Sequence, residues 1–370
     1  MYELNHRRIF LLLTTGCNLH CQYCFERGKH FTSTNFDVIK NVLQDELKDD
    51  QVDYQITFHG GEPFLQFSLI QQTVEWVQRK YTNYHILFDV TTNGTILTPH
   101  MRQWLIAHQD LFTISLSLDG PQEVHNTYRD NSFDRIDIDF YRSLHHCKVK
   151  MTVSPPFLHR MFDDYIYLTE LGFDVSPSLA QEVEWPEELY LDIYDQQLNQ
   201  FVDYQLSHPQ KGLPPFFRYN IAKLSPSRRC QPSLRGCGVY FNTIGYDTKG
   251  ICYPCNGFLN DFNRKIEAQE MEHLNHIFRT IPDAELLSEC EGCIIQPVCS
   301  TCYALNYVYR GSIEHINKQM CSYLIHSIYA TASIWAQAIN SGKDYIWMRE
   351  LSPLDILDTI SGIMSLHQKS

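Results

Sequence analysis

The chain has 370 residues, of which 44% are hydrophobic and 13% aromatic. This length and composition predict a globular protein with a large core, folded as two or three lobes. A net charge of −13 with a pI near 5.7 argues against general attraction to nucleic acid or to anionic membranes, and would attract a basic peptide. Because no apolar run reaches the roughly 18 residues of a membrane helix or resembles a signal peptide, a cytosolic location is expected. In that compartment the 13 cysteines are better explained as metal or cluster ligands than as disulfides.

Strand-like and helix-like segments alternate between residues 8 and 180. The strand-like segments are Ile9–Thr14, Tyr54–Phe58, His85–Thr91, Phe112–Leu118, Val149–Val153 and Phe173–Pro177. The helix-like segments are Thr34–Leu47, Ser68–Tyr81, Thr98–His108, Phe133–Cys147 and Asp163–Leu171. Six strands that alternate with helices predict a parallel sheet with helices outside it.

Three of the predicted strands run into polar, glycine-containing loops. These loops are His59-Gly-Gly-Glu-Pro63, Thr91-Thr-Asn-Gly94 and Ser117-Leu-Asp-Gly120. In parallel α/β folds, ligands bind at the carboxyl ends of the strands. We therefore expect one site to be assembled from consecutive strand tips.

The remainder of the chain divides by composition. Residues 1–180 form the α/β part, and residues 181–229 are a connecting segment with an acidic helix at 187–206 and a Pro-rich stretch at 208–215. Residues 230–321 hold nine cysteines, so that ligated metal is expected to replace much of a conventional core. The tail 322–370 has helical spacing. An isolated thiol, Cys147, is expected to be buried among apolar groups.

The most informative motif is Cys17-x3-Cys21-x2-Cys24. Three thiolates on one loop can hold only three irons of a four-iron cubane, which leaves one iron open to a substrate or cosubstrate. The competing interpretation, a zinc site, lacks a fourth cysteine nearby.

Residues on the strand-tip loops can form the shell of a cosubstrate. Glu62 can pair with an ammonium group, and Gly60 and Gly61 allow close approach of the backbone. Hydroxyl and carboxylate groups of the ligand could be bound by Thr92, Asn93, Ser117 and Arg129. Each has an ordinary alternative, because Asn-Gly is a common turn and a single arginine is usually solvated.

The cysteine loop with Tyr23 before its last cysteine, followed by Gly60-Gly61-Glu62, resembles the radical S-adenosylmethionine (SAM) enzymes. The resemblance covers roughly residues 7–180 and implies a six-strand partial (β/α)6 TIM barrel. It implies that the open iron chelates the amino and carboxylate groups of SAM. Cleavage of SAM then gives methionine and a 5′-deoxyadenosyl radical. Tyr23 joins the residues that this resemblance places around the cofactor.

The second group of cysteines has strong metal-ligand spacing. It reads Cys230-x6-Cys237-x14-Cys252-x2-Cys255, then Cys290-x2-Cys293-x5-Cys299-x2-Cys302, and ends at Cys321. Four thiolates suit zinc and iron–sulfur clusters equally, so that the spacing alone does not choose between them.

The stretch Cys237-x12-Gly250-x4-Cys255 with the later cysteines is similar to the SPASM extension, which carries two auxiliary [4Fe-4S] clusters. This chain departs from that pattern by having x2 between Cys299 and Cys302. The resemblance assigns Cys230, Cys237, Cys252 and Cys302 to the first auxiliary cluster, and Cys290, Cys293, Cys299 and Cys321 to the second. Cys255 is left over, and it could replace Cys252, complete a site or meet the substrate.

SPASM-bearing enzymes generally modify peptides or proteins, so that the resemblance implies an oxidoreductase with three [4Fe-4S] clusters and SAM. Sulfatase maturases of this kind typically have an Asp after the third auxiliary cysteine, and here Tyr253 follows Cys252. This favours a maturase of a ribosomally synthesised peptide that forms a crosslink, with sulfatase maturation as the alternative. Tyr253 and Cys255 are the candidates for catalysis. A non-catalytic iron–sulfur or zinc protein is a further alternative.

The expected partners follow from this assignment. They are a precursor peptide or protein as substrate, an electron donor such as flavodoxin or ferredoxin, and a separate protein that binds a leader peptide. Neither nucleic acid nor membrane is expected as a partner.

Overall fold

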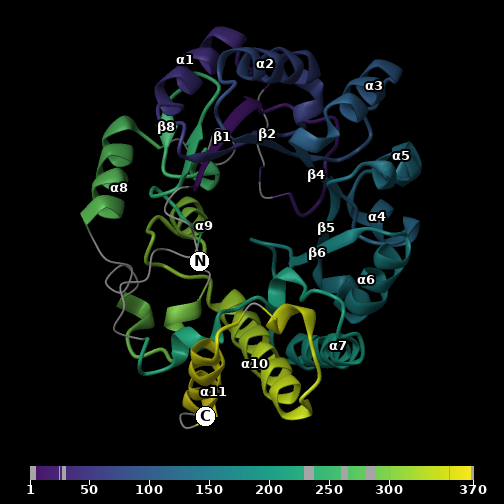
Figure 1. Ribbon diagram of the computed structural model, residues 1–370, viewed down its shortest axis with the longest axis vertical. Coiled ribbons are helices and arrows are strands. Elements are labelled where there is room, and N and C mark those ends of the chain that lie inside the picture. The colour runs from purple at the N-terminus through teal and green to yellow at the C-terminus, as the bar shows by residue number, and fades with distance from the viewer. Residues whose placement is uncertain are drawn as a thin grey trace. The chain divides into compact units, whose positions relative to one another are not determined.

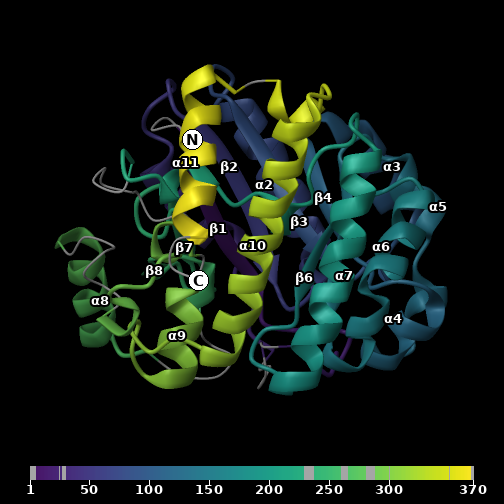
Figure 2. The same ribbon diagram turned by 90° about the horizontal axis from the view of Figure 1, so that it is seen from below.

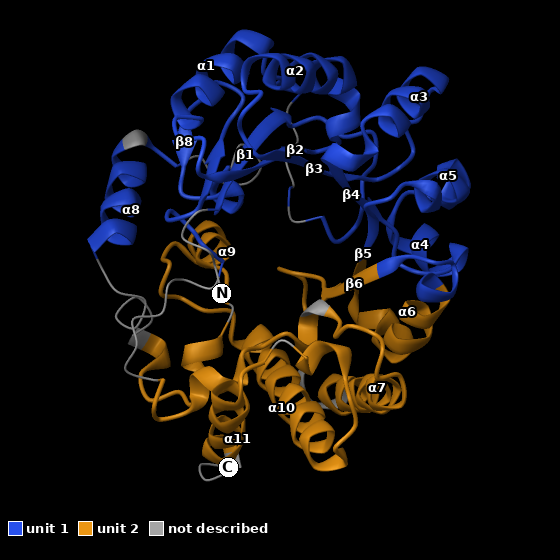
Figure 3. Ribbon diagram, in the orientation of Figure 1, with its two compact units in different colours: residues 1–150, 168–174, 237–281 blue, residues 151–167, 175–236, 282–370 orange. Residues whose placement is uncertain are grey.

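The computed structural model describes residues 6–24, 26, 31–228, 237–259, 266–280, 288–299, 301–349 and 351–367. The chain forms two compact units, shown in blue and orange in Figure 3. Unit 1 comprises residues 1–150, 168–174 and 237–281, and unit 2 comprises residues 151–167, 175–236 and 282–370. Both units are therefore assembled from segments that are distant in the sequence.

Unit 1 is built on a mainly parallel sheet. Its strands are β1 (His6–Thr14), β2 (Asp53–Gly60), β3 (Ile86–Thr92), β4 (Phe112–Ser117), the first part of β5 (Cys147–Val153), β7 (Thr243–Tyr246) and β8 (Cys252–Tyr253). Within this unit they lie in the order β5-β4-β3-β2-β1-β7-β8. Neighbours are parallel except β7 and β8, which are antiparallel. The parallel α/β prediction is confirmed for this sheet.

Helices cover one face of this sheet (Figure 1). They are α1 (Phe36–Glu46), α2 (Phe67–Lys80) and α3 (Pro99–Ala107), and we call the face that they cover the outer face. Asn35 and Thr98 cap α1 and α3 by accepting backbone N–H groups, which fixes where these helices begin. The remaining helices of unit 1 are α4 (Gln122–Tyr128), α5 (Ile138–Ser143) and α8 (Ala268–Thr280).

Alternation along the strands separates two kinds of side chain. Ile56 and Phe88 are paired in register on the outer face and are almost completely buried. The rings of Phe88 and Phe112 stack there with centroids 5.4 Å apart. The opposite face, which we call the inner face, carries mostly polar side chains, because successive residues of a strand point to opposite sides.

The structure corrects two expectations about unit 1. Strands β7 and β8, from the cysteine-rich region, extend the sheet beyond β1, which composition did not predict. The single helix expected over Phe133–Cys147 is instead a 3-10 turn, Phe133–Arg135, followed by the short helix α5. Asp137 accepts the N–H of Phe140 and begins α5 there, because a capping side chain defines a new helix start.

Unit 2 is mainly helical. It contains most of α6 (Met161–Glu170) and β6 (Asp174–Leu179), and all of α7 (Glu187–Ser207), α9 (Tyr303–Arg310), α10 (Lys318–Ser341) and α11 (Pro353–His367). Helices α7 and α10 lie side by side in Figure 2, and Tyr194 of α7 hydrogen-bonds Ser327 of α10 at 2.7 Å. The end of β5 joins β6 through the N–H of Ala180, which donates to the Val153 carbonyl at 2.8 Å.

Among the described residues, no helix is long and apolar enough to cross a membrane. The two units separate the chain by packing, whereas the boundaries expected at residues 180, 229 and 321 separate it by the role of each part. These domain boundaries therefore stay a prediction.

Candidate active site and cluster sites

The cysteine loop follows directly on β1. The backbone N–H of Leu19 donates to Cys17 Sγ at 3.4 Å, and the N–H of Cys24 donates to the Cys21 carbonyl at 3.1 Å. Burial raises the pKa of the Cys21 thiol to about 11, although the Arg129 cation opposes this rise. The thiol therefore holds its proton at neutral pH until a metal replaces it, as expected for a metal ligand.

Glycines let the loop after β2 touch the cysteine loop. The N–H of Gly61 donates to the Thr14 carbonyl at 3.0 Å, and the N–H of Glu62 donates to the Gly16 carbonyl at 2.8 Å. A Cβ at Gly61 would lie 2.8 Å from the Thr15 carbonyl oxygen and closer still to that of Gly16. Only glycine fits, which explains in backbone terms why the Gly-Gly pair stands here.

Glu62 joins the tips of β2 and β3. Its side chain is almost completely buried, and Oε1 accepts the hydroxyl of Thr92 at 2.8 Å and the N–H of Phe64 at 3.0 Å. Oε2 accepts the N–H of Asn93 at 2.7 Å. The carboxylate that the sequence assigns to an ammonium group thus also fixes the loop that carries Thr92 and Asn93.

Asn93 connects this loop to the cysteines. Its Nδ2 donates to Asn18 Oδ1 at 2.9 Å and lies 3.9 Å from Cys17 Sγ. Asn18 in turn donates to Thr95 Oγ1 at 2.8 Å, and Thr95 donates to Asn93 Oδ1 at 2.7 Å. The amide is therefore held in one orientation next to a predicted cluster ligand.

A second connection runs from the cysteine loop to the tip of β4. Arg129 donates from Nε to Asp119 Oδ2 at 2.8 Å and from Nη2 to Oδ1 at 3.1 Å. Tyr23 donates its hydroxyl to the same carboxylate, and the Arg129 guanidinium lies 5.3 Å from the centre of its ring. Burial disfavours the charge of Arg129, but Asp119 and Tyr23 raise its pKa well above its usual range.

The structure thus brings together Glu62, Thr92 and Asn93, which were predicted from the sequence and lie on two loops joined by hydrogen bonds. Ser117 lies at the end of β4. The sequence analysis did not single out Asp119 or Asn18, although both are buried or partly buried polar groups at the centre of these contacts. Asp119 had a detectable signal, because it follows Ser117 on the same strand face and precedes an arginine by ten residues.

Four cysteines of unit 2 lie close together. The pKa of Cys290 is raised by burial and then by the neighbouring Cys293 and Cys321. Burial, together with the neighbouring Cys290, Cys321 and Cys293, raises the pKa of Cys299 to about 11. These are the four residues assigned from sequence to the second auxiliary cluster. Their mutual repulsion as thiolates would be relieved by bound metal.

Cys302 is near that group in sequence, and the groups that act on its thiol are the backbone of Leu305 and Ala304 and the carboxylate of Glu182. It precedes α9, and the backbone N–H groups of Ala304 and Leu305 face its thiol, while burial raises its pKa. N–H groups at a helix start stabilise a thiolate ligand. Its predicted partner Cys237 lies in unit 1, and Cys230 lies outside the described residues.

Cys252 points to the outer face of the sheet. It is paired in register with Tyr246, whose hydroxyl donates to Glu46 of α1 at 2.5 Å. Burial raises the pKa of Cys252, and the other groups that act on it are Tyr246, Glu46, Arg7 and Arg279.

Tyr253 and Cys255, the two candidates for catalysis, have different surroundings from Cys252. Tyr253 is paired with Gly245, so that its side chain lies on the inner face, and its hydroxyl donates to Asp247 at 3.3 Å. Cys255 precedes the 3-10 turn Asn256–Phe258, and its carbonyl carbon lies 3.0 Å from where a Cβ of Gly245 would be. Tyr253 and Cys252 therefore use opposite faces of the same strand.

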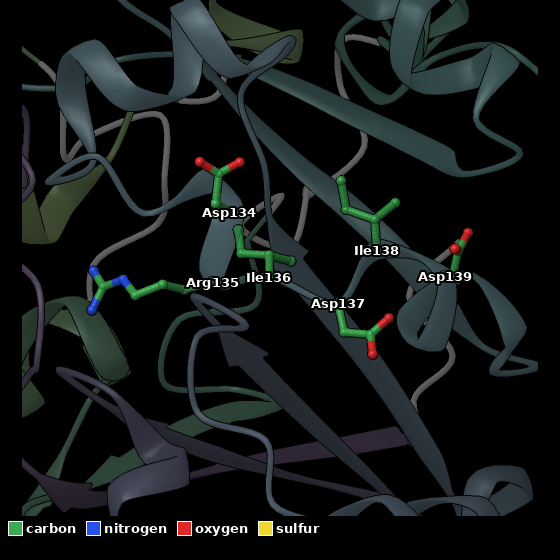
Figure 4. A pocket seen from close by; sticks show the side chains of 6 residues that line it. All are labelled: Asp134, Arg135, Ile136, Asp137, Ile138 and Asp139. Carbon is green, nitrogen blue, oxygen red and sulfur yellow. The ribbon is translucent and has the colours of Figure 1, made fainter.

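Cys147, which was expected to be buried, lies on β5 and is only partly buried, and desolvation raises the pKa of its thiol to about 12. A surface pocket formed by residues 134–139 contains no predicted site residue (Figure 4). No three His, Cys, Asp or Glu side chains among the described residues lie close enough to hold a single metal ion.

Comparison with known proteins supports the iron–sulfur assignment for the first part of the chain. Residues 7–134 match the family described as a 4Fe-4S single cluster domain. A cysteine-type anaerobic sulfatase-maturating enzyme of Clostridium perfringens is 30% identical over 125 residues, which are 31% of this chain and 33% of that enzyme. The chain thus matches only about a third of the length of such a relative.

A longer but weaker likeness extends over both units. The cysteine-type anaerobic sulfatase-maturating enzyme of Clostridium novyi is 22% identical over 323 residues, which are 77% of this chain and 84% of that enzyme.

Solved structures share the fold. Native anSMEcpe with bound AdoMet and the Kp18Cys peptide has a TM-score of 0.69 at 19% identity, covering 90% of this chain and 99% of that one. Streptococcus suis SuiB bound to the precursor peptide SuiA has a TM-score of 0.60 at 17% identity, covering 85% and 75%. Residues 7–134 thus match a 4Fe-4S single cluster domain, and the chain is similar to anaerobic sulfatase-maturating enzymes.

Proposed function

We propose that this chain is a radical SAM enzyme that abstracts hydrogen from a peptide and matures it by forming an intramolecular crosslink. The observation that carries the proposal is the loop Cys17–Cys24. Hydrogen bonds tie this loop to the tips of β2, β3 and β4 through Gly16, Asn93 and Asp119. A loop that only carried electrons would not need three strand tips with amide, hydroxyl and carboxylate groups around it.

The chain's own residues divide the work at this site. Cys17, Cys21 and Cys24 would hold a four-iron cluster, which when bound supplies the electron for reductive cleavage of SAM. Glu62 and the Gly60-Gly61 backbone would receive the ammonium group of SAM, and Ser117 and Arg129 would receive its carboxylate. Asn93 and Thr92 are fixed by Glu62 to bind hydroxyl groups, and Tyr23 positions Arg129.

The grouping of Cys290, Cys293, Cys299 and Cys321 supports a second auxiliary [4Fe-4S] cluster. For the first auxiliary cluster we favour Cys255 over Cys252, together with Cys230, Cys237 and Cys302. Cys252 contacts Tyr246 and the charged groups of the outer face, where a cluster would have to displace the Tyr246 hydrogen bond to Glu46.

One feature supports a peptide crosslink over sulfatase maturation, whereas bound peptides occur in structures of both kinds, anSMEcpe and SuiB. Whichever of Cys252 and Cys255 is the ligand, the residue after it is Tyr253 or Asn256, and neither is the carboxylate typical of sulfatase maturases. Maturation of a sulfatase is the second candidate, because the relatives named above have that activity.

The test is reductive cleavage of SAM. Anaerobically reconstituted protein with dithionite should form 5′-deoxyadenosine, and the C17A/C21A/C24A variant should form none. The C147A variant is the matched control, because it also removes cysteine from unit 1. Formation of 5′-deoxyadenosine by the triple variant would overturn the assignment of the open-iron site.

Incubation with peptide then separates the two candidates. A precursor peptide that loses about 2 Da, with the mass change inside one cyclic fragment, indicates a crosslink. Conversion of a sulfatase peptide's Cys or Ser to formylglycine would instead establish the second candidate. An isolated protein that binds zinc in place of iron would contradict both.

A further inference from the structure

The inner face of the unit 1 sheet carries a group of charged residues that the proposed chemistry does not use. Asp89 of β3 is paired with Thr57, and Lys148 and Lys150 of β5 are paired with Ser115 and Ser117. Every one of these lies on the face opposite the helices, because the register places them out of phase with the buried Ile56, Phe88 and Val149.

Arg8 of β1 completes the group. It lies on the same strand face as the partly buried Phe10 and donates to Gln55 of β2 at 2.9 Å. The fields of Arg8, Lys148 and Lys150 all act on Asp89. We call these four residues the cationic patch; it has three positive charges and one negative charge.

The charges of the cationic patch are not matched by direct contacts. Asp89 Oδ1 is buried and has no hydrogen-bond partner among the described residues. In the same part of the chain, no carboxylate lies at ion-pair distance from Arg8, Lys148 or Lys150. Three cations thus share one carboxylate, and this excess of positive charge on the inner face favours an anionic ligand.

The remaining acids near the inner face already have partners. Glu26 is paired with His59 at 3.0 Å, and Asp119 is bound by Arg129. Asp247 accepts the Tyr253 hydroxyl. The chain therefore supplies no second carboxylate of its own to neutralise the cationic patch, as far as its described residues show.

Lys150 is accessible to a ligand on the inner face, because it is exposed to solvent. Desolvation lowers its pKa, and Lys148 and Arg8 act in the same direction, whereas Asp89 raises it.

The cationic patch lies within reach of the proposed reaction site. Lys150 is level with Ser117, and Asp89 of β3 precedes Asn93, the first residue after that strand, by four residues. At about 3.3 Å per residue, Asp89 is about 13 Å below the strand tip, which is the length of about four residues of an extended peptide.

We infer that the cationic patch binds an aspartate or glutamate side chain of the peptide substrate, within about four residues of the residue that reacts. This inference rests on the proposed function and names the substrate class of the same site. The overall charge of −13 predicts attraction of a basic peptide, and the inner face reverses that sign locally. A carboxylate there would contact the lysine ammonium groups and neutralise the excess charge.

The experiment is a selection from an mRNA-displayed library of random peptides with a central serine or cysteine. The full chain, reconstituted with iron and bound to SAM, is immobilised anaerobically and the retained peptides are sequenced. We expect Asp and Glu to be enriched about tenfold over the input at positions within about four residues of the centre. The K148E/K150E variant should reverse the preference towards Lys and Arg.

The matched control is K40E/K80E, which makes the same charge change on α1 and α2. Its selected peptides should keep the acidic preference and its 5′-deoxyadenosine formation should be unchanged. Thermal unfolding and iron content establish that the K148E/K150E variant is folded, and K148R/K150R should retain the acidic preference.

Three outcomes would overturn the inference. Retention of peptides without acidic enrichment by the wild-type chain refutes it and leaves the proposed function intact. The same acidic enrichment with K148E/K150E also refutes it, and a higher KM for SAM in that variant would assign the lysines to the cosubstrate. Retention of no peptide at all, with 5′-deoxyadenosine still formed, contradicts the peptide-modifying function itself.

Discussion

Asp119 accepts two hydrogen bonds from Arg129, one from Nε at 2.8 Å and one from Nη2 at 3.1 Å. Both side chains are buried, and Tyr23 of the cysteine loop donates to the same carboxylate. Removing one partner of a buried ion pair leaves an uncompensated charge, whereas the pair itself contributes little net stability. The carboxylate therefore controls both the direction of Arg129 and the position of the cysteine loop.

We predict that D119N lowers the stability of the protein by about 3–5 kcal/mol, because Arg129 stays charged and buried. The thermal midpoint should fall by several degrees, and the EPR signal of the reduced first cluster should change shape. The control is D139N, whose partner Arg142 is at the surface, 2.6 Å away. It should change stability by less than about 1 kcal/mol. Equal midpoints for both variants would contradict the role given to Asp119.

The contact between Gly61 and the cysteine loop makes a second prediction. In G61A the added Cβ would collide with the carbonyls of Thr15 and Gly16, which belong to the backbone and cannot move aside. We expect a loss of about 1–3 kcal/mol and weaker iron binding at Cys17, Cys21 and Cys24. G212A is the matched control, because nothing lies within 4 Å of its Cβ position. Iron content and 5′-deoxyadenosine formation report the difference, and an unaffected G61A would show that the loops are not locked.

Iron content can show whether Cys252 or Cys255 is a ligand of the first auxiliary cluster. With three four-iron clusters the chain should bind about twelve irons. We expect C255S to lose about four of them and C252S to keep all twelve, because Cys252 faces Tyr246 and Glu46. Iron and sulfide analysis with Mössbauer spectra distinguishes the variants. The reverse pattern would assign Cys252 as the ligand.

The buried side chain of His125 makes the stability of the folded protein depend on pH. Its side chain is fully buried, Nε2 is 2.9 Å from Ser132 Oγ, and burial lowers its pKa from 6.5 to about 4. Because the unfolded chain binds this proton first as pH falls, stability is complete above pH 6.5 and declines from there to about pH 4. The difference between these two pKa values corresponds to a loss of about 3 kcal/mol in the free energy of unfolding.

The check is a comparison of thermal midpoints at pH 7.5 and pH 5.0. H125Q should lose less stability than the wild type over this interval, because it has no proton to gain. H100Q, which changes an exposed histidine hydrogen-bonded to Gln71, should behave as the wild type does. Parallel pH curves for the wild type and H125Q would contradict the assignment.

Periodicity and local motifs were sufficient for much of the fold. All six expected strands form near their predicted positions, because alternating apolar runs between glycine-rich loops are local signals. The prediction of a single helix over Phe133–Cys147 was wrong, because Asp137 caps a shorter helix in the middle of that segment. Strands β7 and β8 could not be predicted, because β7 is completed by pairing with β1, more than two hundred residues earlier.

The spacing of Cys17, Cys21 and Cys24 alone predicts three ligands for an iron–sulfur cluster, because it limits the number of thiolates on this loop whatever the fold. The sequence also predicted that the backbone at Gly60 and Gly61 is approached closely by another group. Only the tertiary structure decided the pairing of Asp119 with Arg129, the outward direction of Cys252 and the cationic patch around Asp89. These depend on strand register and on contacts between distant segments, and a shift of one residue would move each side chain to the other face of the sheet.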